Sequence, residues 1–235
     1  MKILAVDTSA NVASAAVTVG GRLICECILN HKKTHSEKIM PMIEQVLRDS
    51  ETDIQEIDLF AVANGPGSFT GLRIGVSTVK ALAHATGKPT VGVSTLEGLA
   101  YNLAGVDGII CPIMDARRSQ VYNAVYKSEN GVLSEIKAPR ALALSECIQE
   151  FEKDEKVYFL GDGVLAYREE IIIKMGERAV FAPTNSLLQR ASSVAELARI
   201  KAQSGQTDTY LSLMPVYLRK PQAEREYEEK QGKER

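Results

Sequence analysis

The chain has 235 residues, of which 45% are hydrophobic and 25% charged, and its formal net charge at pH 7 is −2. These values are typical of a globular protein with a core of its own, and the charge disfavours a strongly basic nucleic-acid binder. The first apolar run ends at Asp7, so no signal peptide is expected, and no later run approaches the roughly 18 residues of a membrane span. We therefore expect a cytoplasmic protein without membrane contact, and four cysteines without a C-x-x-C pair fit that reducing compartment.

The first half of the chain alternates strands and helices in a regular order. Strands are predicted at residues 3–7, 14–19, 22–28, 59–63 and 89–93, and helices at residues 36–48, 70–85 and 94–103. The pair Gly20-Gly21 predicts a hairpin between the second and third strands. Pro41 means that the first helix either begins late or is kinked. This order describes a mixed sheet with helices on its faces.

The second half repeats this order with little residue identity. Strands are predicted at residues 109–115, 120–127, 132–137, 157–160 and 180–181, and helices at residues 144–152, 164–175 and 187–202. Asp7 and Asp115 each close the first strand of their half. Such a repeat predicts the duplicated α/β architecture of actin, Hsp70 and sugar kinases, an ASKHA or ribonuclease H-like fold, and two unrelated α/β lobes are the alternative.

Three regions follow from this pattern. Residues 1–104 are expected to form an actin-like lobe and residues 105–214 a reduced second lobe. Residues 215–235 read as a short extended segment and a charged helix that can pack back on the first lobe.

Two neighbouring motifs are candidates for anion or nucleotide binding. An acid and two hydroxyls at a strand end can meet phosphates and magnesium, although a turn stabilised by its own side chains is the competing interpretation. The loop of residues 64–71 opens a helix whose free amides could hold an anion, but no Gly-Lys-Ser/Thr follows as in a Walker loop. The candidate residues are Asp7, Thr8, Ser9, Gly65, Gly67 and Ser68.

The helix at residues 70–85 is apolar on most sides and must be covered all round. Gly71 and Gly75 lie on one of its faces and permit close packing, either against a partner helix or inside the chain. His31 and His35 have a spacing that could bind zinc on a helix, but no third ligand is evident. We therefore predict no metal site.

Five motifs together resemble the TsaB family, also called YeaZ. They are spread over nearly the whole chain and read DTS at residues 7–9, HSE at 35–37, GPGSFTGLR at 65–73, GKP at 87–89 and PVYLRKPQAE at 215–224. The resemblance implies an actin-like fold and a role in making threonylcarbamoyladenosine on tRNA. It also implies pairing with the catalytic paralogue TsaD, and with a TsaE-like ATPase, in a complex whose substrate is tRNA.

The resemblance further implies a pairing surface on the helices at residues 36–48 and 70–85. The expected interface residues are Ser36, Ile39, Met40, Ile43, Leu47, Gly71, Arg73, Ile74, Gly75 and Thr78. A charged residue at Ile39, Ile43 or Ile74 is expected to abolish pairing while the monomer stays folded. The catalytic paralogue carries a metal-binding His-x-x-x-His where this chain has Thr95 and Leu99. Leucine cannot ligate a metal, so the resemblance implies the non-catalytic partner and speaks against a peptidase.

The leading hypothesis is therefore a non-catalytic scaffold that needs no cofactor, with ATP or ADP and magnesium as candidates near the partner interface. The alternative is a small ATP-dependent kinase or phosphohydrolase that uses Asp7 and magnesium. We expect a homodimer when the partner is missing. Contact with tRNA through Arg117, Arg118, Arg219 and Lys220 stands beside the simpler interpretation that these residues are solvated.

Overall fold

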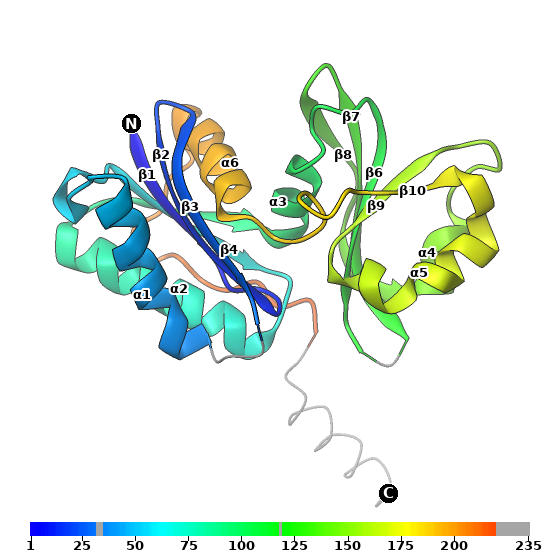
Figure 1. Ribbon diagram of the computed structural model, residues 1–235, viewed down its shortest axis with the longest axis horizontal. Coiled ribbons are helices and arrows are strands. Elements are labelled where there is room, and N and C mark those ends of the chain that lie inside the picture. Colours follow the sequence, from blue (N-terminus) through cyan, green and yellow to red (C-terminus); the bar gives the residue numbers. More distant parts are fainter. Residues whose placement is uncertain (32–34, 118, 220–235) are drawn as a thin grey trace, which may run out of the picture.

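The computed structural model describes residues 1–31, 35–117 and 119–219, and within these ranges the chain forms two five-stranded mixed sheets (Figure 1). The strands are β1 (Lys2–Asp7), β2 (Val12–Val19), β3 (Arg22–Asn30), β4 (Leu59–Gly65), β5 (Thr90–Ser94), β6 (Gly108–Asp115), β7 (Gln120–Glu129), β8 (Val132–Ala143), β9 (Val157–Leu160) and β10 (Ala179–Phe181). The α-helices are α1 (His35–Asp49), α2 (Phe69–Thr86), α3 (Thr95–Tyr101), α4 (Leu144–Gln149), α5 (Asp162–Met175) and α6 (Ala191–Gln203).

The two sheets have the same topology, strand for strand. The first has the order β3-β2-β1-β4-β5, and the second, read from its other edge, has the order β8-β7-β6-β9-β10. In each sheet the first strand pairs antiparallel with the second and parallel with the fourth. The predicted duplication is therefore confirmed, and the second copy is reduced at α4 and β10, which have six and three residues.

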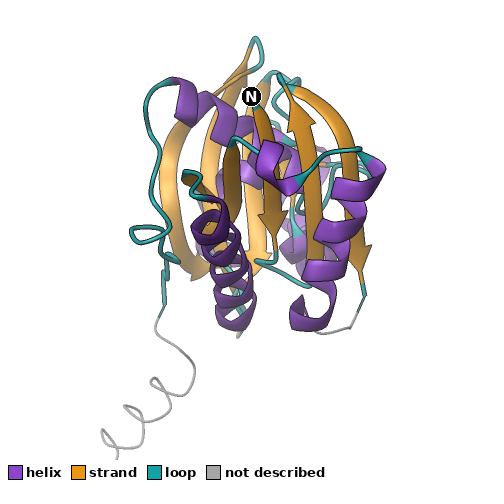
Figure 2. Ribbon diagram, turned by 90° about the vertical axis from the view of Figure 1, so that its left-hand side faces the viewer, coloured by secondary structure: helices purple, strands orange, loops and turns teal. Residues whose placement is uncertain are grey.

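Helices α1 and α2 cover the outer face of the first sheet, which Figure 2 turns toward the viewer. Helix α1 begins at His35, so Pro41 lies well inside it and the helix does not begin late. Helix α2 ends at Thr86 and is capped by Gly87, which adopts the left-handed conformation with φ 69°. The side chains of the two helices that point inward form one core with the sheet.

The third helix of each half packs against the sheet of the other half. Helix α3 contributes Leu96 and Leu99 to the core of the second sheet. Helix α6 contributes Ala191, Val194 and Ala198 to the inner face of the first sheet. We use "first lobe" for the first sheet with α1, α2 and α6, and "second lobe" for the second sheet with α3, α4 and α5. The boundary expected at residues 104 and 105 therefore misplaced both third helices, because sequence order does not say which sheet a connecting helix covers.

Helix α6 also begins four residues later than predicted, at Ala191 and not at Leu187. Asn102 holds the preceding segment away from helical geometry, because its amide nitrogen donates to the carbonyls of Ser186 and Leu188 at 3.0 and 2.9 Å. Such side-chain bonds to distant carbonyls leave no periodic signal in the sequence.

Beyond α6, residues 208–219 form a strap that returns to the first lobe. Asp208 pairs with Thr90 in an isolated antiparallel bridge, and the amide of Val216 donates to the carbonyl of Asn64 at 2.7 Å. The strap contacts the first lobe, and residues 215–219 form no strand. The charged helix predicted from residue 221 onward lies outside the described residues.

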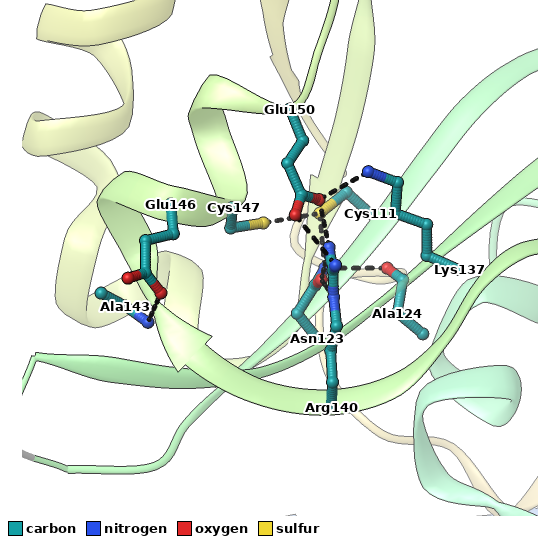
Figure 3. A network of polar contacts seen from close by, with 9 residues as sticks. All are labelled: Cys111, Asn123, Ala124, Lys137, Arg140, Ala143, Glu146, Cys147 and Glu150. Atoms are coloured by element: carbon teal, nitrogen blue, oxygen red, sulfur yellow. Dashed lines mark hydrogen bonds and ion pairs between the residues drawn. The ribbon is translucent and has the colours of Figure 1, made fainter.

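A polar network that runs from partly exposed charged side chains to the buried Asn123 and Cys111 fastens α4 to the second sheet (Figure 3). Arg140 and Lys137 of β8 both bind the carboxylate of Glu150, which follows α4, and Arg140 also donates to the side chain of Asn123. Asn123 in turn donates to the sulfur of Cys111 at 3.0 Å. Burial raises the pKa of the Cys111 thiol, so this cysteine stays protonated and unreactive.

Candidate functional site

A cleft of about 550 Å³ opens between the two lobes. Its first-lobe wall is the turn after β1 and the loop that begins α2, with Ser9, Gly67 and Ser68. Its second-lobe wall is the end of β6 and the start of α5, with Asp115 and Asp162, and the end of the strap closes it. Of the six candidate anion-binding residues, Ser9, Gly67 and Ser68 line the cleft, whereas Asp7, Thr8 and Gly65 are not among its lining residues.

The motif at the end of β1 is an internal turn. Asp7 is 2% exposed, and one of its carboxylate oxygens accepts from the amide and the hydroxyl of Ser9 at 2.8 and 2.6 Å. The hydroxyl of Thr8 donates to the carbonyl of Gly71 at 2.7 Å. Burial raises the pKa of Asp7 to about 6, against the lowering effect of the bonds from Ser9. The carboxylate of Asp7 and the hydroxyls of Thr8 and Ser9 thus all bond within the fold, which agrees with the interpretation of residues 7–9 as a turn stabilised by its own side chains.

The glycines of the loop allow backbone to pack directly on backbone. A Cβ atom at Gly67 would lie 2.3 Å from the carbonyl oxygen of Ser9, and one at Gly71 would lie 2.1 Å from that of Thr8. Gly65 has φ 132°, and its Cβ would lie 2.1 Å from the carbonyl oxygen of Val216 in the strap. The amide of Ser68 is also in use, since it donates to the carbonyl of Ser9 at 2.7 Å. The loop therefore fixes the start of α2 against β1 and the strap.

The second-lobe wall contains residues that the sequence did not single out. Asp162 faces Asp115, and burial together with the negative charge of Asp115 raises the pKa of Asp162 to about 6. The hydroxyl of Tyr167 donates to Asp115 at 3.1 Å. The sequence did contain a signal for this wall of the cleft. Gly161 and Gly163 flank Asp162 at a strand-to-helix junction, as Gly65 and Gly67 flank Pro66 in the first half. Gly161 and Gly163 both lie against the carbonyl of Ile113 in β6, whereas Gly67 and Gly71 lie against the carbonyls of Ser9 and Thr8 just after β1.

The basic residues considered for tRNA contact are only partly described. Arg117 lies at the cleft with a left-handed backbone, φ 65°, and a largely exposed side chain. Arg219 of the strap donates to the carbonyl of Ala116 at 2.8 Å and so joins the strap to the second lobe. Arg118 and Lys220 lie outside the described residues.

The ten expected interface residues do not share one surface. Ser36, Met40 and Arg73 are exposed, and Leu47, Ile74 and Thr78 are half-buried. Ile39 and Ile43 are each only 1% exposed, in the core beneath α1. In this fold neither side chain reaches the outer surface of α1, so a charge at either position is expected to disrupt the fold and not only the pairing.

Gly71 and Gly75 do not face a partner helix either. A Cβ at Gly75 would lie 2.4 Å from the hydroxyl oxygen of Thr8, so this glycine face of α2 lies against the end of β1. Helix α2 is covered by the sheet, by α1 and by the strap. Of the two explanations for the glycine spacing, close packing inside the chain is the observed one.

The positions of the paralogue's histidines lie inside the protein. Thr95, the first residue of α3, is fully buried, and Leu99 is 1% exposed in the core of the second lobe. The ring of His35 lies 2.7 Å from the carbonyl of Ala10. Across the described ranges, no group of three or more His, Cys, Asp or Glu side chains could hold a metal ion. Nor does any helix in those ranges have the length and apolar character needed to span a membrane.

Comparison with known proteins agrees with this architecture. The family model described as TsaD, tRNA N6-adenosine threonylcarbamoyltransferase, matches residues 23–227. The tRNA threonylcarbamoyladenosine biosynthesis protein TsaB of Bacillus subtilis is 36% identical over 232 residues, which cover 98% of this chain and 100% of that protein. The TsaB protein of Escherichia coli is 36% identical over 135 residues, covering 56% of this chain and 58% of that protein.

Solved structures give the same result. A Pseudomonas aeruginosa protein described as similar to the peptidase YeaZ has a TM-score of 0.81 and 27% identity, covering 93% of this chain and 99% of that one. A dehydratase activator of Clostridium difficile with bound ADPNP has a TM-score of 0.52 at 11% identity, covering 88% and 97%, and shows the ASKHA-type fold alone. The full-length match to TsaB and the shared duplicated fold establish that the chain belongs to the TsaB (YeaZ) family of tRNA threonylcarbamoyladenosine biosynthesis proteins.

Proposed function

We propose that this chain is a non-catalytic subunit that supports threonylcarbamoyladenosine formation by pairing with a TsaD-like catalytic paralogue. The observation that carries the proposal is the closed, apolar environment of α3. Thr95 and Leu99 take the positions where the resemblance places the paralogue's two metal-binding histidines, and both are buried in the core. A catalytic metal needs a set of ligating side chains and an open coordination position, but Leu99 cannot ligate a metal and neither residue is open to solvent.

The proposed pairing surface is the exposed side of α1 and α2. Met40 of α1 is 40% exposed, and Arg73 of α2 is exposed close to the start of its helix. Helices α1 and α2 lie side by side on the outer face of the first sheet (Figures 1 and 2). A partner of the same fold could place its own two helices across them, with a few apolar residues at the centre of the contact. A TsaE-like ATPase and the tRNA substrate would join the resulting complex.

We predict that Met40→Asp and Arg73→Glu weaken pairing with the purified TsaD-like paralogue by about tenfold or more, the loss typical of central interface residues. Ile173→Asp on α5 is the matched control, because Ile173 is an apolar side chain that is 83% exposed on the other lobe. Binding is measured by calorimetry, and tRNA modification is reconstituted with and without each variant.

Full modification without this chain would contradict the proposal. So would magnesium-dependent turnover of ATP by the isolated chain that is lost in Asp7→Ala, since this result would favour the kinase alternative. We expect no turnover, because the carboxylate of Asp7 is buried and bonded to Ser9. Binding of ATP or ADP near the paired surface would be compatible with the proposal, so nucleotide binding is measured separately from turnover.

A further inference from the structure

The strap runs antiparallel to α2 along nearly its whole length. The ring of Tyr210 contacts that of His84 near the end of the helix in a tilted arrangement, with centroids 4.5 Å apart. The ammonium group of Lys80 then donates to the carbonyl of Leu213 at 3.1 Å. At the start of the helix, the tilted rings of Tyr217 and Phe69 are in contact with centroids 4.6 Å apart, and the guanidinium of Arg73 donates to the Tyr217 hydroxyl at 3.4 Å. The strap and α2 therefore form one continuous surface.

The backbone of the strap is firmly held. Besides the bridge to Thr90, the side chain of Asn64 donates to the carbonyl of Met214 at 3.2 Å, and Leu213 is 1% exposed within the core. Gly65 permits the strap to approach so closely that no side chain fits between them. These contacts thus fix the backbone of the strap and the direction of its side chains.

The strap exposes apolar side chains to solvent. Residues 209–218 contain no charged residue, although a quarter of the chain is charged. Four large apolar side chains within seven residues are exposed: Leu211, Met214, Val216 and Tyr217. An ordered, uncharged segment that displays aromatic, methionine and aliphatic side chains has the composition of an interface centre. Within the described residues these side chains remain exposed, so their burial requires another molecule or other residues.

We infer that the strap is a third element of the docking surface and that the TsaD-like paralogue covers it together with α1 and α2. This inference rests on the proposed function. The paralogue is the fitting occupant because the strap lies beside α2 and extends its surface, so a partner that lies across α2 is well placed to cover the strap as well. The TsaD family model matches residues 23–227, a range that includes α1, α2 and the strap, so a TsaD-like paralogue is expected to have corresponding segments.

The test uses the full-length chain with Leu211→Asp or Met214→Asp, and Ile173→Asp as the matched control. Leu211 is 71% exposed, so a charge at this position has little effect on folding, and thermal melting verifies this for each variant. We expect both strap variants to bind the purified paralogue about tenfold more weakly or worse, and the control to stay within about twofold of the unmodified chain.

The outcomes separate the inference from the proposed function. If Met40→Asp weakens pairing and both strap variants bind like the control, the strap is not part of the surface and the inference is overturned while the function stands. If the strap variants lose only self-association in sedimentation, the occupant is a second copy and the inference is also wrong. If neither Met40→Asp nor the strap variants weaken binding, both the inference and the proposed pairing surface fail.

Discussion

At the scale of single residues, Asp7 shows how a motif that resembles a phosphate site can serve the fold. An acid followed by two hydroxyls at a strand end is compatible with either role. In the folded chain the carboxylate accepts two bonds from Ser9, and Thr8 donates to the carbonyl of Gly71. The motif ties the end of β1 to the start of α2, and in this way it sets the position of the proposed docking helix.

The raised pKa of Asp7 predicts a pH dependence of stability. Between about pH 4 and 6 the folded chain retains a proton that the unfolded chain has lost, because burial raises the pKa from 3.8 to about 6. Stability should therefore fall as the pH rises through this window, by up to roughly 3 kcal/mol at neutral pH from this group. Asp7→Asn removes the titration, so its free energy of unfolding in urea should fall less between pH 4 and 7.

Asp162 gives a second, independent test of this explanation, because burial and the charge of Asp115 raise its pKa to about 6 as well. Asp162→Asn should remove a separate part of the pH dependence, and the double variant should remove both parts. An unfolding free energy for Asp7→Asn that follows the unmodified chain at every pH would show that the carboxylate is not titrating there.

At the scale of elements, the glycine loop and the start of α2 depend on contacts that only glycine allows. The distances from Gly67 and Gly71 to the carbonyls of Ser9 and Thr8 leave no room for a Cβ atom. The carbonyl groups belong to the backbone after a central strand and cannot move aside cheaply. Gly161 and Gly163 in the second lobe also lie against a backbone carbonyl, that of Ile113 in β6, so close glycine contacts occur near the start of a helix in both lobes.

Gly71→Ala should therefore lower the free energy of unfolding by about 3 kcal/mol, because either the helix or the strand end must shift. Gly98→Ala is the matched control on α3, since its Cβ would lie 3.5 Å from a methyl group of Val194, an ordinary contact. Helix propensity predicts that this control is neutral or stabilises by about 0.5–1 kcal/mol. Urea unfolding measures both, and equal effects of the two substitutions would contradict the steric explanation.

At the scale of the whole molecule, the two halves are joined by exchange of their third helices. The inner face of the first sheet is covered by α6, which comes from the second half of the chain. Helix α3 leaves the first half and packs Leu96 and Leu99 beneath the second sheet. The strap then crosses back along α2, and Arg219 bonds to the carbonyl of Ala116 at the cleft. Neither lobe is complete without a segment from the other half.

A fragment of residues 1–104 should therefore not fold on its own, since it would expose the apolar inner face of the first sheet and the buried side of α3. Circular dichroism and a dye for exposed apolar surface test this prediction. Adding a fragment of residues 105–235 should restore cooperative unfolding. Cooperative unfolding of residues 1–104 alone would mean that α6 is dispensable and that the first half is an independent domain.

The sequence by itself determined the order of the elements, the duplication and the family. Local signals carried these features: apolar periodicity, Gly20-Gly21 at the hairpin, and the motifs spread from residue 7 to residue 224. It also raised the turn interpretation of residues 7–9 that the structure bears out. These features depend on residues close together in the chain.

Only the tertiary structure decided which side chains face outward and which half each third helix completes. Ile39 and Met40 are neighbours in the sequence, yet the first is in the core and the second is exposed, because α1 presents one side to the sheet. The cleft brings together residues 9, 115, 162 and 219 from distant parts of the chain. Contacts over such separations depend on the packing of whole elements, and no periodicity within one element encodes them.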